Sequence, residues 1–157
     1  MEEIRAENWI DREDCDPIHI LLVEDNAGDV FLTKKAFEAG RIDHKIQVAP
    51  DGESALSIIR MQEDYTSNDV PDLILLDMNL PRKNGKQILE EIKNDDEIKH
   101  IPVLMLTSSS AKNDICESYD LHVNGYIVKP SELSEFHRVV TAVENFWFDI
   151  NTLTRRY

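Results

Sequence analysis

The chain has 157 residues, 41% of them hydrophobic, which is the size of one globular domain with a sizeable core. Its formal net charge of −14 argues against unaided binding to nucleic acid or to an anionic membrane surface, because both require clustered Lys and Arg. Two cysteines argue against a disulfide framework and favour a reducing compartment. No apolar run approaches the roughly 18 residues that a membrane span needs, so we expect a cytoplasmic protein.

Residues 1–16 are rich in acids and precede the periodic part of the chain. A short helix and a disordered leader both fit this segment, and the sequence does not decide between them. We therefore divide the chain into an acidic N-terminal extension at 1–16, one domain at 17–148 and a C-terminal tail at 149–157.

From residue 18 onward, short apolar runs alternate with helical patterns. Buried runs bounded by turn residues predict five strands, at 18–23, 44–49, 73–76, 101–106 and 125–128. Apolar residues at helical spacing predict five helices, at 27–39, 51–61, 86–93, 111–121 and 131–148. The last helix carries three adjacent aromatic residues at 146–148, which cannot all face inward.

Strands that alternate with helices of this length imply right-handed crossovers and a parallel sheet covered on both faces. The predicted fold class is therefore α/β, a doubly wound five-stranded parallel sheet. We adopt for it the strand order 2-1-3-4-5 of flavodoxin-like folds, which is a known arrangement and does not follow from these residues. In this order the first, third and fourth strands are neighbours, so residues at their carboxyl ends converge.

The run 73–76 carries no charge and ends on Asp77, before a loop punctuated by Pro81 and Gly85. In an open parallel sheet, ligands bind outside the carboxyl ends of the strands, so Asp77 is a candidate functional residue. Taken alone, Asp77 could equally be an ordinary acid that ends a strand.

Glu24 and Asp25 follow the first strand and would lie beside Asp77 in this strand order. Two unit charges about 4 Å apart repel by roughly 4 kcal/mol at an effective dielectric constant of 20, so a bare cluster would be strained. A divalent cation relieves the repulsion, and a site made of carboxylates, a backbone carbonyl and water suits Mg²⁺. We therefore predict a magnesium site at this edge of the sheet.

With the metal bound, the carboxylate of Asp77 could attack a phosphoryl group as a nucleophile and form an aspartyl phosphate. Lys129, at the end of the last strand, lies within plausible reach of the phosphoryl oxygens. Thr107, at the end of the fourth strand, could offer its hydroxyl to one of them.

The residues at the strand ends form an ordered set: Glu24, Asp25, Asp77, Thr107, Lys129 and Pro130. In this set, the chain resembles the response-regulator receiver family of two-component signalling over residues 17–148. The resemblance implies that Asp77 is the phosphoacceptor and a metal ligand. It also implies that Asp25 binds magnesium directly, whereas Glu24 acts largely through water. Asn79 would bind the metal through its backbone carbonyl.

The same resemblance assigns Lys129 to the phosphoryl group and makes its bond to Pro130 cis, as is usual in the family. Thr107 and Tyr126 match the family's switch pair, in which the hydroxyl turns toward the phosphate and the aromatic ring rotates inward. One departure is Glu24, which stands where many members have Asp.

Two longer strings, at 63–85 and 117–129, are similar to the single-domain regulators that partner phytochrome-type histidine kinases in cyanobacteria. Those regulators tend to pair as homodimers and carry a C-terminal extension, as residues 149–157 would here. We accordingly expect a histidine kinase and a downstream protein as partners, with no direct contact to nucleic acid or membrane.

The resulting hypothesis is a single-domain response regulator that is phosphorylated on Asp77 and then changes its protein-binding surface. We expect a phosphoacceptor with self-phosphorylation and autodephosphorylation chemistry, not an enzyme. One alternative is a phosphorylation-independent module for binding or dimerisation. Another is an aspartyl-phosphate phosphohydrolase, which needs a second acid two residues after the nucleophile, where this chain has Asn79.

Overall fold

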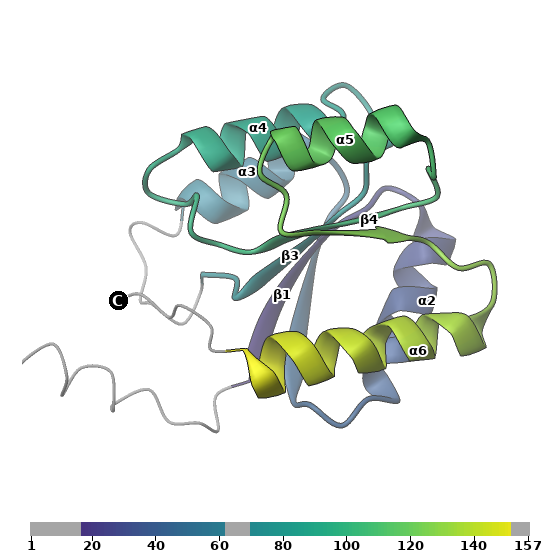
Figure 1. Cartoon of the computed structure of the whole chain (residues 1–157). Coiled ribbons are helices and arrows are strands. Elements are labelled where there is room, and N and C mark those ends of the chain that lie inside the picture. The colour runs from purple at the N-terminus through teal and green to yellow at the C-terminus, as the bar shows by residue number, and fades with distance from the viewer. Residues whose placement is uncertain (1–16, 62–69, 152–157) are drawn as a thin grey trace, which may run out of the picture.

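Five parallel strands form one sheet in the order β2-β1-β3-β4-β5, as the computed structural model shows for residues 17–61 and 70–151 (Figure 1). The strands are β1 (Ile18–Val23), β2 (His44–Ala49), β3 (Leu73–Leu76), β4 (Val103–Thr107) and β5 (Gly125–Val128). The predicted doubly wound, flavodoxin-like α/β fold is confirmed. The expected N-terminal extension at 1–16 and the segment 152–157 of the expected tail lie outside the described residues.

Helices cover both faces of the sheet (Figure 1). They are α2 (Ala27–Glu38), α3 (Gly52–Met61), α4 (Gly85–Asn94), α5 (Lys112–Asp120), α6 (Leu133–Val143) and a π-helical segment, η3 (Glu144–Ile150). α3, α4 and α5 lie on one face, and α2 and α6 lie side by side on the other. None of the helices in the described residues is both long and apolar enough to span a membrane.

Strand β1 lies between β2 and β3 and is buried on both faces, and its side chains alternate between two core clusters. Leu21 and Val23 belong to the cluster beneath α3 and α4. Ile20 and Leu22 belong to the cluster that includes Phe136 of α6. This period of two is the side-chain alternation of a strand, and it explains why the apolar run 18–23 is continuous.

The fourth strand begins and ends later than the predicted run 101–106. Ile101 donates its backbone N–H back to the carbonyl of Ile98 at 3.1 Å and so belongs to a turn. Pro102 has no N–H to give to the ladder, although its carbonyl accepts from Ile74 at 2.9 Å. At the other end, Thr107 still pairs with Val128 of β5, so the strand includes the candidate threonine.

The last helix begins at Leu133 and changes at Glu144 from α-helical to π-helical geometry. Phe146 is 51% exposed, while Trp147 and Phe148 pack partly buried against the core cluster shared with α2 and α6. The three adjacent aromatic residues therefore do not all face inward, as the sequence predicts.

Glu144 ties the end of this helix to the connection between α2 and β2. Its carboxylate is buried, and its Oε2 accepts the backbone N–H of Ile42 at 2.8 Å. A Cβ atom at Gly40 would meet the same carboxylate, so a larger residue at this position would have to displace the side chain of Glu144. The buried charge thus provides an acceptor for a backbone donor far away in the sequence.

Candidate functional site

The carboxyl ends of β1, β3 and β5 carry the predicted polar residues, and backbone hydrogen bonds fix each of them just beyond its strand. The N–H of Glu24 donates to Ala49 and that of Asp77 donates to Val23, both at 3.0 Å. The N–H of Lys129 donates to Thr107 at 2.7 Å. The backbone hydrogen bonds between strands thus continue past the apolar runs and fix the backbone from which these three side chains project.

Three carboxylates meet at this edge, from Glu24, Asp25 and Asp77. One oxygen of each lies within 4.8 Å of the others. Glu24 and Asp77 are buried, whereas Asp25 is exposed. The Oδ1 atom of Asp77 is buried and has no hydrogen-bond partner among the described residues. The predicted convergence of the strand ends is therefore present in the structure.

The residues present fit a divalent cation bound by oxygen. The cluster is made of carboxylates alone, which suits Mg²⁺ or Mn²⁺, and a cation would satisfy the unpaired Oδ1 of Asp77. Asn79 is exposed in the loop two residues beyond Asp77. The role of its backbone carbonyl as a metal ligand stays a prediction.

Lys129 reaches into this cluster from the end of β5, and its side chain is only 8% exposed. Its Nζ lies 2.5 Å from Oε2 of Glu24, 2.9 Å from Oδ2 of Asp29 and 3.5 Å from Oδ2 of Asp77. The buried ammonium thus neutralises part of the negative charge. We call Glu24, Asp25, Asp29, Asp77 and Lys129 the strand-end site.

Asp29 is the member of this site that the sequence did not indicate. It lies in the first turn of α2, where an acid is ordinarily explained by the helix dipole. The signal that could have found it is its position five residues after Glu24, on the helix that directly follows β1.

Burial dominates the electrostatics of Glu24 and raises its pKa to about 7. Its hydrogen bonds with Lys129 and with the N–H of Asn26 oppose this shift, and the charge of Asp77 adds to it. Burial by itself would lower the pKa of Lys129, but hydrogen bonds to Glu24 and Asp29 outweigh it and raise that pKa. Without a metal ion, the charged form of Glu24 is therefore disfavoured near neutral pH.

Thr107 is the last residue of β4 and Tyr126 is the second residue of β5, and both contact the loop that leads into α5. Thr107 is fully buried, and its Oγ1 accepts the N–H of Ser109 at 3.4 Å. The hydroxyl of Tyr126 donates to the carbonyl of Ser109 at 2.9 Å, and its ring packs against the core beneath α3 and α4. Both side chains thus contact the same loop, while their role as a switch pair stays a prediction.

The start of α4 is held close to the loop after Asp77. The N–H of Gly85 donates to the carbonyl of Met78 at 2.8 Å. A Cβ atom at Gly85 would lie 2.7 Å from the Cα of Met78, so only glycine allows this approach. The side chain of Asn84 caps the helix by accepting the N–H of Gln87 at 3.0 Å.

The expected cis bond between Lys129 and Pro130 is wrong for this structure, since the peptide bonds of the described residues include no cis bond. The trans form is the intrinsically favoured one for a bond before proline. Lys129 reaches Glu24 and Asp29 with its peptide bond in this form.

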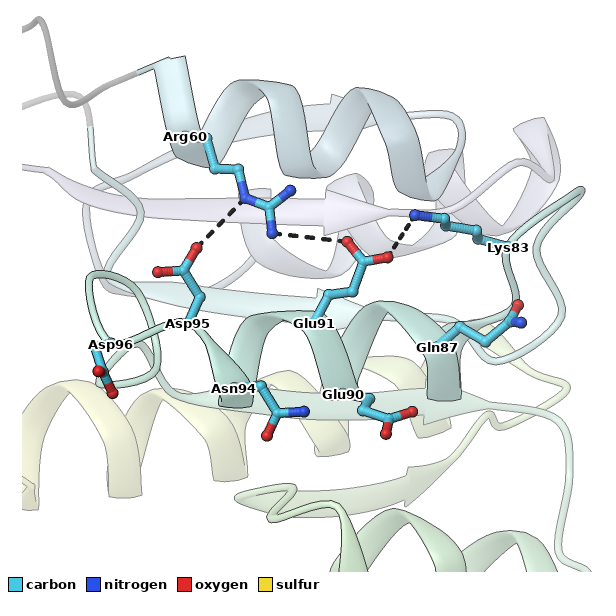
Figure 2. Close-up of a pocket in the computed structure, with 8 residues that line it drawn as sticks. All are labelled: Arg60, Lys83, Gln87, Glu90, Glu91, Asn94, Asp95 and Asp96. Atoms are coloured by element: carbon cyan, nitrogen blue, oxygen red, sulfur yellow. Dashed lines mark hydrogen bonds and ion pairs between the residues drawn. The ribbon is translucent and has the colours of Figure 1, made fainter.

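A second charged region lies between α3 and α4, away from the strand ends. We call it the α3–α4 hollow, and it is lined by Arg60, Lys83, Gln87, Glu90, Glu91, Asn94, Asp95 and Asp96 (Figure 2). Figure 2 shows Arg60 between Asp95 and Glu91, at 3.4 and 3.7 Å. Lys83 pairs with Glu91 from the other side. The predicted site residues lie elsewhere.

Known proteins are similar to this chain in sequence and fold over most of its length. Residues 20–141 match the model of the response regulator receiver domain. Response regulator Rcp1 of Synechocystis sp. is 40% identical over 137 residues, which are 87% of this chain and 93% of that protein.

Two solved structures are similar over nearly the same length. The phosphorylated cyanobacterial phytochrome response regulator RcpA gives a TM-score of 0.80 at 42% identity, covering 87% of this chain and 98% of that one. The Mn²⁺-bound form of response regulator Rcp1 gives a TM-score of 0.78 at 40% identity, covering 88% and 99%. Receiver domains are generally signalling modules and not enzymes. With its matching fold and its acidic strand ends, this chain belongs to the response regulator receiver family.

Proposed function

We propose that this chain is a signalling switch in which Asp77 accepts a phosphoryl group from a histidine kinase in a Mg²⁺-dependent reaction. The observation that supports the proposal is the buried Oδ1 of Asp77, which has no hydrogen-bond partner within residues 17–61 and 70–151 and lies beside two other carboxylates and a buried ammonium. An atom in this position has lost its contact with water and gained no partner, which costs free energy unless a ligand binds there.

In the proposed reaction, an oxygen of Asp77 attacks the phosphorus of phosphohistidine. The new P–O bond forms as the P–N bond breaks, and the electron pair of that bond leaves with the imidazole. Mg²⁺ held by Asp25, Asp77 and the carbonyl of Asn79, with Glu24 acting through water, would neutralise charge on the phosphoryl oxygens. Burial excludes water from Asp77 and strengthens every electrostatic contact around it.

The ammonium of Lys129 would bind one phosphoryl oxygen, and the hydroxyl of Thr107 would bind another. Lys129 is already 3.5 Å from Asp77, so a modest movement brings it to an oxygen beyond that carboxylate. The hydroxyl of Thr107 bonds only weakly to Ser109, at 3.4 Å, and can therefore turn away at little cost.

Rotation of the Thr107 side chain would affect the position of Tyr126, because both side chains are hydrogen-bonded to Ser109. In our proposal, phosphorylation shifts the population between two arrangements of this loop and so changes the surface formed around α5 and β5. The phosphoryl group can shift this equilibrium only by as much as it binds one arrangement better than the other.

For partners, we propose a histidine kinase of the phytochrome type and a downstream protein, with a homodimer as one form of output. The support is the similarity to the phytochrome response regulator RcpA and to Rcp1 over most of this chain. The half-exposed Phe146 offers an apolar contact for such a partner. We also propose 17–148 as the working domain in a cytoplasmic protein.

The test is intact mass spectrometry after incubation with phosphoramidate or acetyl phosphate, with and without magnesium. We expect one added phosphoryl mass that requires magnesium and is absent from Asp77→Asn. The matched control is Asp120→Asn, which removes one exposed acid from α5 and should be labelled like the wild type.

Size-exclusion chromatography of the same samples would test the output. A change in elution volume on labelling supports a change in association state. Absence of any added mass from either donor would reject the phosphoacceptor proposal and leave the phosphorylation-independent binding module.

A further inference from the structure

Lys129 is shared unequally among three carboxylates. An ammonium has three donor hydrogens, and Glu24 and Asp29 accept from it at 2.5 and 2.9 Å. Asp77, at 3.5 Å, lies beyond the usual range for such a bond. The lysine is thus held more closely by two neighbouring acids than by the proposed phosphoacceptor.

The position of Asp29 is fixed by its helix. Its N–H donates to the cap residue Asn26 at 3.0 Å, and its carbonyl accepts the hydroxyl of Thr33 at 2.8 Å. Lys129 also starts from a fixed point, because its own N–H is bonded to Thr107. The pair therefore spans two ordered elements, the first turn of α2 and the end of β5.

Glu24 and Asp29 differ in what a bound cation would do to them. Glu24 belongs to the carboxylate group that can hold a metal ion, so Mg²⁺ would compete with Lys129 for its charge. Asp29 is not one of these three carboxylates. Its hold on the ammonium would persist after the metal binds.

We propose, on the basis of the function proposed above, that Asp29 is a positioning residue that restrains Lys129 and slows phosphorylation of Asp77. For Lys129 to bind a phosphoryl oxygen, its bond to Asp29 must lengthen or break. The negative charge of Asp29 also partly neutralises the ammonium of Lys129, which would otherwise attract the incoming phosphoryl group more strongly. Both effects favour the unphosphorylated chain.

The first experiment compares the rate of labelling by phosphoramidate in saturating magnesium. Asp29→Asn should be labelled faster than the wild type by about fivefold, which corresponds to about 1 kcal/mol in activation free energy. Asp29→Glu keeps the charge and should return the rate toward the wild-type value. Glu38→Gln removes an exposed acid from the same helix and should leave the rate unchanged.

The second experiment asks whether Asp29 acts through Lys129. In a Lys129→Ala background, the double variant with Asp29→Asn should be labelled at the same rate as the Lys129→Ala single variant. An equal increase in both backgrounds would overturn the proposal, because the effect would then be a general one of charge near the site. An unchanged or slower rate for Asp29→Asn alone would overturn it too, since Asp29 would then be neutral or would help to orient the lysine.

A third measurement needs neither magnesium nor a phosphodonor. The urea midpoint of the metal-free chain should fall on Asp29→Asn in the wild-type background but not in the Lys129→Ala background. Equal shifts in both backgrounds would show that the pair is not coupled and would reject the restraint.

The two proposals fail in different ways. A wild-type chain that accepts no phosphoryl group rejects the function, whatever the urea midpoints show. A wild-type chain that is labelled normally, while Asp29→Asn is not labelled faster, rejects only the restraint by Asp29.

Discussion

The strand-end site and the α3–α4 hollow both gather acids and bases from separate elements, yet they differ in how much water reaches the charges. The basic side chain of the strand-end site, Lys129, is 8% exposed, and Glu24 beside it is 2% exposed. In the hollow, the side chain of Arg60 is 45% exposed and that of its partner Glu91 is 32% exposed. Lys129, Glu24 and Asp77 must therefore satisfy their charges within the protein, whereas Asp25 and Asp29 of the same site and the residues of the hollow share theirs with solvent.

This difference has opposite energetic consequences. Exposed ion pairs contribute about 0 to 1 kcal/mol, because water screens the attraction and the side chains lose rotamer freedom. Buried carboxylates that outnumber their cation are destabilising until a ligand balances them. Charge density alone therefore does not distinguish a ligand site on this protein, but burial of an unbalanced set does.

The largest expected effect is on Asp77. Asp77→Asn should reduce labelling by small phosphodonors below detection, because the amide is not a nucleophile of comparable strength. Intact mass spectrometry measures this directly. The same change in the hollow, Asp95→Asn, should leave labelling intact, and a loss there would contradict the distinction between the two regions.

Removal of Lys129 should have the largest effect on stability. Lys129→Ala leaves buried carboxylates without their cation, so we expect the metal-free chain to lose about 3 kcal/mol of unfolding free energy near neutral pH. Urea unfolding measures the loss, and magnesium should restore part of it. The variant should still be labelled, but labelling should no longer change its elution volume. An unfolding free energy equal to that of the wild type would mean that the site is effectively solvated.

The pKa of Glu24 gives a pH dependence whose sign follows from its direction. The folded, metal-free chain keeps this proton up to about pH 7, whereas the unfolded chain releases it near the ordinary pKa of 4.5. The stabilisation from Glu24 is therefore complete below about pH 4.5 and is lost as the pH rises to about 7, by an amount on the order of 3 kcal/mol.

Urea unfolding of the metal-free chain at several pH values tests this dependence. Glu24→Gln should flatten the curve between about pH 5 and pH 7, since the amide does not titrate. Glu91→Gln in the hollow is the control and should leave the slope as it is. Parallel curves for wild type and Glu24→Gln would mean that burial does not perturb this carboxyl.

The smallest effect belongs to the hollow itself. Arg60→Ala removes contacts to Glu91 and Asp95 that are partly exposed, so we expect a change of less than about 1 kcal/mol in unfolding free energy. Labelling of Asp77 should be unchanged. A severalfold change in the labelling rate would show that the hollow is coupled to the strand ends, so the two regions would not act independently.

Much of the fold follows from local pattern. β1 and β3 were predictable because uncharged runs that end on an acid are typical of strands buried on both faces. The start of β4 was not predictable, because Pro102 lies within a continuous apolar run. Only the hydrogen bond from Ile101 to Ile98 shows that the chain turns before the strand begins. Strand order came from a known arrangement and not from the residues.

The strand-end site was predictable to the extent that its members follow strands. Glu24, Asp77 and Lys129 converge because parallel strands end at one edge of the sheet. Asp29 follows no strand directly, and its contact with Lys129 depends on how α2 lies over that edge. The hydrogen bond between Glu144 and Ile42 joins residues 102 positions apart, and the hydrophobic periodicity of the sequence does not predict it.

The contact made by Glu144 also bears on where the folding unit ends. The family pattern stops at residue 141, three residues before this buried carboxylate. A protein shortened to that limit would leave the N–H of Ile42 without its acceptor and uncover the space beside Gly40. It would also lose the bonds that Arg41 makes to Asn145 and Asp149. We therefore expect a chain shortened to residue 141 to be less stable than one that retains η3, and urea unfolding of the two would measure the difference.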